Sequence, residues 1–224
     1  MSINFHAYQS RGYLFENYEA QCEQWRNMFK SFEPVRVAEI LNLKYDNEYL
    51  YLIYYGNHYR LSLQEGILYK KNDTDWTDKL YFNESMSIYH LLYYVKDEPK
   101  NSGIWIPNEQ LDSRRKSGKI NDILLESFSK SFTGKCSELR KVCEKMKGIP
   151  LEKGDVAYEF EVFPQVKIRL IFWDADEDFS AQTQILVDSR ITDYVHLETT
   201  GCIVSDLLEM LEIQGGEILY EISD

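Results

Sequence analysis

An acidic stretch between two apolar segments is the first place where the sequence suggests chemistry. Residues 172–188 read FWDADEDFSAQTQILVD. Asp174, Asp176 and Asp178 fall at positions one, three and five of an EF-hand-like calcium loop. The sixth position of such a loop turns sharply and is usually glycine, and the twelfth is a bidentate glutamate. Here these positions are Phe179 and Ile185, so the sequence argues against an EF-hand.

Two interpretations of this stretch remain. The sequence favours an exposed acidic turn that joins two strands, with its charges solvated and Phe179 packed inward. The alternative is a magnesium or calcium site of another type, and its candidate ligands are Asp174, Asp176 and Asp188.

A second candidate lies in the segment DYVHLETTG, where His196 precedes Glu198 by two residues. Histidine can act as a base or a ligand near neutral pH, and a carboxylate can orient it. At this spacing the two side chains share a face in a strand but not in a helix. We take His196, Glu198 and Asp188 as the candidate catalytic residues. A structural histidine is the favoured alternative, because the four histidines form no HExxH or other paired spacing.

Other motifs argue against common activities. The sequence has no GxxxxGK[ST], no GxGxxG and no GxSxG, so it predicts no cofactor-binding residues and points to no particular cofactor. Gly215-Gly216 is typical of a turn. The cysteines form no CxxC, and we expect them to pack as small reduced side chains. They are Cys22, Cys136, Cys143 and Cys202.

Tyrosine is abundant, with 17 copies, and several cluster between residues 49 and 59. Such an aromatic face can stack bases or sugars. We see no basic companions for it in the sequence, so a core or partner surface is the favoured interpretation.

Composition narrows the class further. The 224 residues carry 25 basic and 37 acidic side chains, a net charge of −12, which disfavours nucleic acids and anionic membrane surfaces. The basic cluster Arg114-Arg115-Lys116 with Lys119 is expected to be a solvated loop. The N-terminal segment lacks the apolar region of a signal peptide, and runs such as 49–55 are too short to span a bilayer. We therefore expect a cytoplasmic protein.

The elements that must position these residues alternate between helical and strand periodicity. Helices are predicted at 10–32, 35–41, 84–95, 120–132, 136–147 and 202–212, with Asn83 as the N-cap of the third. Strands are predicted around Gly56-Asn57, at 67–71, in GIWIP (103–107), and at 156–163, 166–173, 181–188 and 217–222. The order predicts an α+β fold with antiparallel sheets from two β-meanders packed with helices. We expect the chain to form one domain over 1–224, or two tightly packed lobes at 1–96 and 119–224.

The second meander resembles the DUF3786 family. The matching elements are Gly154-Asp155, Phe163-Pro164, Phe172-Trp173, the acidic turn Asp176–Phe179, the strand Ile185–Asp188, and Tyr194 to Glu198. Val187 and His196 depart from the family pattern. The resemblance implies an occurrence largely in anaerobic bacteria and archaea, and an association with iron–sulfur or corrinoid proteins. It implies no role for any residue.

These observations favour a non-catalytic accessory protein that binds a ligand, a protein partner or a second copy of itself. The alternative is a metal-dependent or acid–base enzyme that uses Asp174, Asp176, Asp188, His196 and Glu198.

Overall fold

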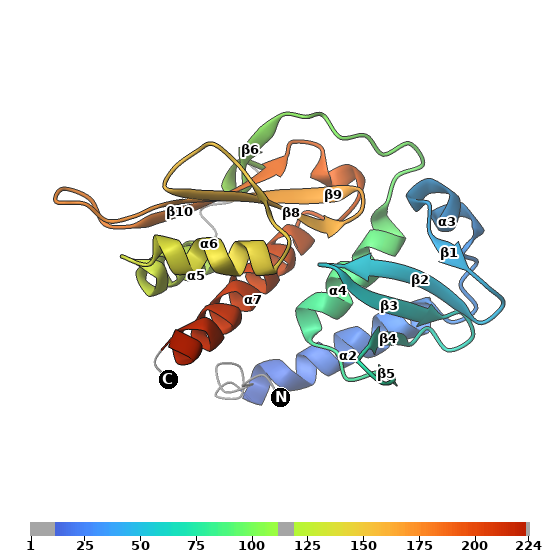
Figure 1. Cartoon of the computed structure of the whole chain (residues 1–224). Coiled ribbons are helices and arrows are strands. Elements are labelled where there is room, and N and C mark those ends of the chain that lie inside the picture. The colour runs from blue at the N-terminus through green and yellow to red at the C-terminus, as the bar shows by residue number, and fades with distance from the viewer. Residues whose placement is uncertain (1–11, 112–118, 223–224) are drawn as a thin grey trace.

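Two antiparallel sheets, each packed against helices, form the fold (Figure 1). The computed structural model describes residues 12–111 and 119–222, and the side chains of residues 19–111 and 123–216. The predicted α+β class is confirmed. The basic cluster at 114–116 lies outside the described residues.

The first sheet, which we call sheet A, runs in chain order from its first strand to its fifth. Its strands are β1 (Lys44–Tyr45), β2 (Tyr49–Tyr54), β3 (Asn57–Ser62), β4 (Leu68–Lys71) and β5 (Trp76–Thr77). The predicted hairpin is confirmed, but its turn is Tyr55-Gly56, one residue earlier than expected. Both turn residues have positive φ, 46° and 72°, as a two-residue type I′ turn requires.

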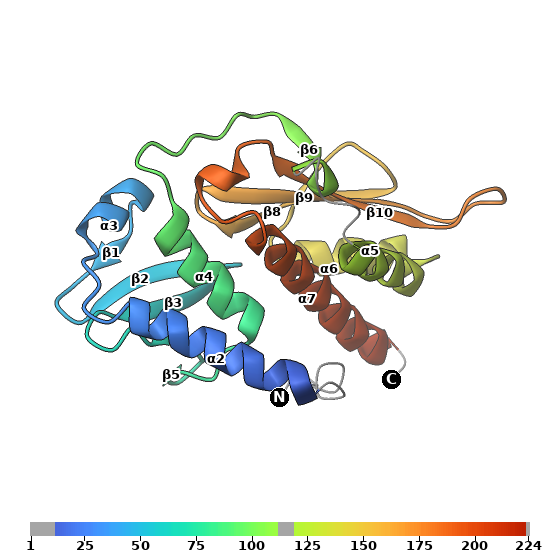
Figure 2. The same cartoon turned by 180° about the vertical axis from the view of Figure 1, so that it is seen from behind.

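Helices cover one face of sheet A. They are α2 (Gly12–Met28) and α4 (Phe82–Tyr94), while the short helix α3 (Val35–Leu41) lies beside β1 (Figure 1). Seen from behind, α2 and α4 lie on the same side of the sheet (Figure 2). The N-cap of α4 is Tyr81 and not Asn83, whose amide lies inside the helix and hydrogen-bonds the carboxylate of Asp206.

The second sheet, sheet B, is the predicted second meander with one strand added at each edge. Its strands are β6 (Trp105–Pro107), β7 (Ile149–Pro150), β8 (Val156–Phe163), β9 (Val166–Trp173) and β10 (Gln182–Asp188). The spatial order is β6-β10-β9-β8-β7. Two short 3-10 turns follow its edge strand and its last strand in sequence: η1 (Asn108–Leu111) comes after β6, and η2 (Ile191–Asp193) comes after β10.

Three helices pack with sheet B, namely α5 (Lys119–Phe132), α6 (Cys136–Lys145) and α7 (Thr199–Ile222). The predicted final strand at 217–222 is wrong, because α7 continues through it. Gly215-Gly216 lies inside this helix and makes no turn. A Cβ at Gly215 would come within 2.9 Å of the Phe132 ring, so the glycine lets α7 approach α5 closely.

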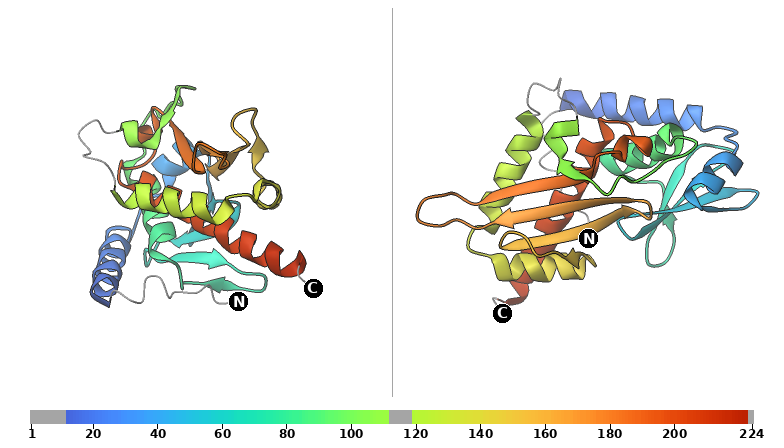
Figure 3. Two further views of the ribbon diagram at one scale, coloured as in Figure 1. Left: turned by 90° about the vertical axis from the view of Figure 1, so that its left-hand side faces the viewer. Right: turned by 90° about the horizontal axis from the view of Figure 1, so that it is seen from above.

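One continuous buried core includes side chains from both halves of the chain. The two sheets meet where the backbone N–H of Tyr55 donates to the carbonyl of Val162 at 2.8 Å. α4 packs along α7 between them, and the view from above shows the sheets side by side (Figure 3). The division into one domain or two lobes stays a prediction. None of the helices described above has the length and apolarity that a bilayer crossing needs.

Candidate functional site

A cleft of about 820 Å³ lies beside the loop that joins β9 to β10. This loop projects from the rest of the molecule (Figure 1). The walls of the cleft come from η1, the middle of α5, the residue before β8, and the loop with the first residues of β10. Segments far apart in sequence therefore build one concave surface, which is the usual form of a ligand site.

The lining of the cleft is acidic and aromatic. Its carboxylates are Glu109, Glu126, Asp155, Asp174 and Asp176, and its aromatic side chains are Trp173 and Phe179. No lysine, arginine or histidine is among its described lining residues. Lys130 pairs with Glu126 at 2.6 Å, but both side chains are exposed, and such a pair is weak. The cleft therefore has a negative potential beside aromatic rings, a combination that attracts organic cations.

Asp174, a candidate metal ligand, lines this cleft but is also a structural anchor. Its Oδ1 accepts hydrogen bonds from the backbone N–H groups of Gly134 and Ala175, each at 2.8 Å, and its Oδ2 accepts one from the Cys136 thiol. The Gly134 N–H contributes most to holding the pKa of Asp174 below its usual range. The side chain thus fastens the start of the loop to the turn between α5 and α6.

Asp176 also lines the cleft, and it shapes the loop itself. Its Oδ1 accepts hydrogen bonds from the backbone N–H groups of Asp178 and Phe179, at 2.9 and 2.7 Å. The predicted inward packing of Phe179 is wrong, since its side chain is 68% exposed. The local hydrogen bonds hold the backbone so that the phenyl ring lies on the cleft wall and in solvent.

Asp188, predicted with the metal ligands and the catalytic residues, lies at the opposite end of β10 from the acidic loop. Its carboxylate is buried and accepts four hydrogen bonds. The donors are the backbone N–H groups of Ser102, Gly103 and Arg190 and the Ser102 hydroxyl, at 2.8–3.0 Å. Burial opposes ionisation, but these donors together hold the pKa of Asp188 below its ordinary value. The four donors make Asp188 an anchor for the segment that crosses between the halves.

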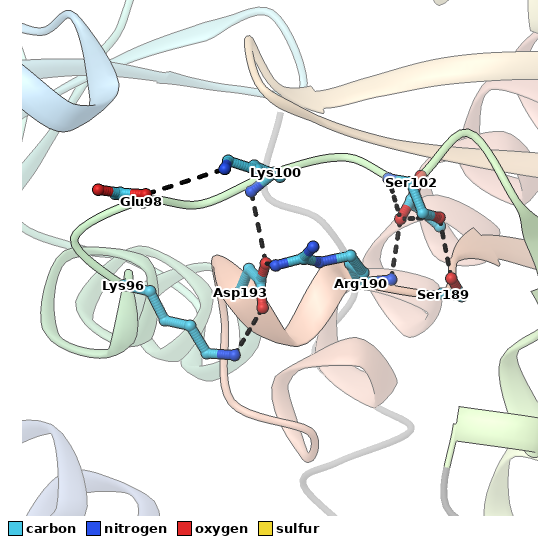
Figure 4. Close-up of polar contacts among 8 residues, drawn as sticks. Lys96, Glu98, Lys100, Ser102, Ser189, Arg190 and Asp193 are labelled. Carbon is cyan, nitrogen blue, oxygen red and sulfur yellow. Dashed lines mark hydrogen bonds and ion pairs between the residues drawn. The ribbon is translucent and has the colours of Figure 1, made fainter.

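A second buried carboxylate, which we did not single out from the sequence, holds the other end of this segment. The carboxylate of Asp193 accepts hydrogen bonds from the ammonium of Lys96 at 2.6 Å, from the guanidinium of Arg190, and from the Lys100 backbone N–H at 3.4 Å (Figure 4). We name Asp188, Asp193 and their partners the crossing-segment clamp. No spacing rule points to it, because Lys96 is 97 positions away from Asp193.

His196 lies in another place again, in a cluster of rings at the start of α7. Its ring centre is 4.9 Å from Tyr94 and 6.0 Å from His90, and Trp25 stacks edge-on against His90 at 4.7 Å. His90 is bonded through Nδ1 to the Thr199 hydroxyl at 2.6 Å, and burial, with His196 nearby, lowers its pKa to about 4. Glu198 is exposed, and its carboxylate is 3.9 Å from His196 Nδ1. Sequence reasoning placed His196 beside Glu198 but did not find its ring partners.

The predicted site residues therefore divide among three locations: the cleft, the clamp and the ring cluster. Across residues 12–111 and 119–222, no three histidine, cysteine, aspartate or glutamate side chains gather so that they could hold a metal ion. All four cysteines are free thiols, and Cys143 is fully buried as a core side chain. The catalytic and metal roles of Asp174, Asp176, Asp188, His196 and Glu198 stay predictions.

Comparison with known proteins identifies the family to which the chain belongs. The profile described as "Domain of unknown function (DUF3786)" matches residues 33–210, which include both sheets, the cleft and the clamp. Neither the search of curated proteins nor that of solved structures gave a match. The profile spans most of the 224 residues, so the chain belongs to the DUF3786 family.

Proposed function

We propose that this protein is a non-catalytic binding protein that holds a cationic segment of a partner protein in the acidic cleft. One observation carries the proposal: five carboxylates and two aromatic side chains line the cleft, without a basic residue among its described lining. Arginine and lysine fit such a lining, because they combine a charge with an apolar stem or a planar face.

An exposed aromatic side chain on the wall of the cleft supports a polypeptide ligand. Phe179 stands mostly in solvent on the cleft wall. An exposed aromatic ring with a charged surround is typical of the anchors of protein interfaces. The net charge of −12 would steer a basic segment toward the protein and speed its association.

The test uses short peptides and salt. A fluorescently labelled peptide of alternating arginine and leucine is titrated with the full chain, beside a twin that has glutamate in place of arginine. We expect saturable binding of the arginine peptide alone, weakening as salt rises. Combining Glu109→Gln with Glu126→Gln should weaken it roughly tenfold, because two rim charges are lost. Phe179→Ser should also weaken it, at any salt concentration.

The matched control combines Glu39→Gln with Glu161→Gln, which removes two exposed carboxylates outside the cleft. Equal weakening by this variant would mean that only the overall charge attracts the peptide, and the cleft would lose its role. Wild-type affinity in the Glu109, Glu126 double variant would have the same meaning.

The wider setting of the proposal rests on the chain's composition and its family. We infer a cytoplasmic location from the chain's composition, and a partner in anaerobic iron–sulfur or corrinoid metabolism from the family resemblance. A second copy of the chain is the other partner class, and size measurement across the peptide titration distinguishes it.

A further inference from the structure

The face of sheet A that turns away from α4 carries a cluster of aromatic rings around one arginine. Along β2 the buried residues Leu50, Leu52 and Tyr54 face the helices, so Tyr49 and Tyr51 lie on the opposite face. The strand register places Arg60 between Tyr51 and Tyr69 on that same face. Arg60 is therefore the basic companion of the tyrosines that sequence reasoning did not find.

Aromatic rings surround the Arg60 guanidinium. Its central carbon is 4.0 Å from the ring centre of Tyr49, 4.4 Å from that of Trp76 and 5.3 Å from that of Tyr69. Contacts of this kind hold an arginine in place through cation–π attraction. They also occupy the faces of the guanidinium, so the N–H groups at its edge are what it can offer to an acceptor.

One of those N–H groups, the one on Nε, has no acceptor among the described residues. Arg60 Nε is buried and has no hydrogen-bond partner. Asp46 is close enough for Arg60 to lower its pKa slightly, but its carboxylate is already engaged. It accepts hydrogen bonds from the backbone N–H groups of Glu48 and Tyr49 and from the Tyr51 hydroxyl, each at 2.8 Å. A charged donor that is held, partly buried and unpaired is costly, and an acceptor would relieve the cost.

A second arginine in the same chain shows what completes such an arrangement. Arg169 on β9 lies 3.8 Å from the ring centre of Trp105. Glu159, directly opposite it on β8, accepts a hydrogen bond from Arg169 Nε at 2.9 Å. The cross-strand neighbours of Arg60 are both tyrosines, Tyr51 and Tyr69, so no carboxylate stands in the equivalent place.

We propose that Arg60 binds a carboxylate that comes from outside the chain, on the surface formed by the rings of Tyr49, Tyr69 and Trp76. A planar carboxylate matches the edge of the guanidinium with two parallel hydrogen bonds. The rings beside the guanidinium also offer apolar contacts to an organic acid, which inorganic phosphate cannot use. The carboxylate belongs to a small aromatic acid or to the end of a peptide. This site is separate from the acidic cleft, and neither depends on the other.

The experiment reads Arg60 directly. The Nε–H resonance of Arg60 is assigned by its loss in Arg60→Lys and followed by NMR in the full chain. The probes are benzoate, a short peptide with a free C-terminal carboxylate, its C-terminally amidated twin, and inorganic phosphate. We expect a saturable shift with benzoate or the free-acid peptide, and which of them binds more tightly identifies the source of the carboxylate. Trp76 fluorescence should report the same affinity.

The variants separate the site from general charge effects. Arg60→Lys keeps the positive charge but loses the two parallel N–H donors of the guanidinium. Tyr69→Leu keeps the arginine but removes one of the rings beside it. We expect at least a tenfold loss of affinity in the first and a smaller loss in the second. Arg169→Lys is the matched control, because its carboxylate is internal, and it should bind like wild type.

Three results would overturn the proposal. They are no saturable shift with either carboxylate probe, equal binding of the amidated peptide or of phosphate, and equal loss of affinity in Arg169→Lys. Circular dichroism and thermal unfolding of each variant show whether a lost signal reflects binding or unfolding. If Arg60→Lys unfolds, Tyr69→Leu and the amidated twin still decide the question.

Discussion

The phenol of Tyr54 donates a 2.6 Å hydrogen bond to the carboxylate of Asp206 and so joins sheet A to α7. Burial raises the pKa of Asp206 to about 7; the Tyr54 hydrogen bond opposes the rise, and the charges of Glu84 and Glu209 add to it. The contact between the two halves of the chain therefore contains a carboxyl group that titrates near neutral pH.

The first prediction is a pH dependence of stability that Asp206 causes. Because its pKa is higher in the folded than in the unfolded chain, the folded protein binds more protons between about pH 4 and about pH 7. Its contribution to stability is therefore largest at low pH and declines as pH rises through 7, at up to about 1.4 kcal/mol per pH unit. Asp206→Asn, which keeps an acceptor for Tyr54, should lose this dependence. Urea unfolding gives the free energy of unfolding of the wild type and of Asp206→Asn. The difference between these two free energies should change by roughly 1–2 kcal/mol between about pH 5.5 and about pH 7.5.

Other groups titrate in the same range, so the comparison is a difference between two proteins. The pKa of Glu209 is raised by burial and acts in the same direction as that of Asp206. His90 acts in the opposite direction, because its folded pKa of about 4 makes the protein lose stability as pH falls below about 6.5. Both contributions are common to wild type and variant and cancel. Parallel pH curves for the two proteins would contradict a raised pKa for Asp206.

The second prediction concerns the crossing-segment clamp. Asp188→Ala leaves the backbone N–H groups of Ser102, Gly103 and Arg190 without their acceptor. We expect the free energy of unfolding to fall by about 2–4 kcal/mol, since each buried unpaired donor is costly. Asp178→Ala, in the exposed acidic loop, should change it by less than about 0.5 kcal/mol. Denaturant unfolding and the arginine-peptide titration are measured on both variants.

The same variants test the roles predicted for Asp188 from the sequence. If Asp188 is an anchor, the peptide affinity of the folded Asp188→Ala protein should equal that of wild type. An Asp188→Ala protein with wild-type stability that loses a bound metal or an activity would instead favour the metal-dependent or acid–base enzyme.

The third prediction compares the two adjacent glycines of α7. A Cβ at Gly216 meets nothing within 4 Å, so Gly216→Ala should stabilise the protein by about 0.5–1 kcal/mol through helix propensity. A Cβ at Gly215 would lie 2.9 Å from Phe132, whose ring is buried, so Gly215→Ala should destabilise it by about 1–2 kcal/mol. Thermal unfolding should therefore shift in opposite directions for the two variants. Shifts of the same sign would mean that α7 and α5 do not approach each other as described.

Local patterns in the sequence were enough for most elements. Alternation along 156–163 and 166–173 predicted β8 and β9 to the residue, because every second residue from Val156 and from Val166 is apolar and buried, which gives a period of two. The prediction failed for α7, where Gly215-Gly216 reads locally as a turn. In the structure Gly215 lies against the ring of Phe132, a tertiary contact that no local rule includes.

The site was less predictable than the fold, because its residues act through partners that are distant in sequence. Asp174 and Asp176 were found as a local acidic run, and they do line the cleft. Glu109 and Glu126 join them only through the packing of η1 and α5. No sequence motif includes Asp206, because its hydrogen-bond partner Tyr54 is 152 positions away. Arg60 stood beside the tyrosine cluster in the sequence, but its lack of a carboxylate became visible only with the strand register.

The crossing-segment clamp also determines where the chain can be divided. Asp193 holds Lys96 and Asp188 holds Ser102, so the segment before β6 is fastened to the C-terminal half along its whole length. β6 then pairs with β10 as an edge strand of sheet B. A chain break or circular permutation at this junction should therefore be tolerated better at the end of α4, before Lys96, than within the clamp. A break in the polar residues 97–103, where composition alone suggests a linker, would instead cut through the clamp, because it separates Lys96, which Asp193 holds, from Ser102 and Gly103, which Asp188 holds.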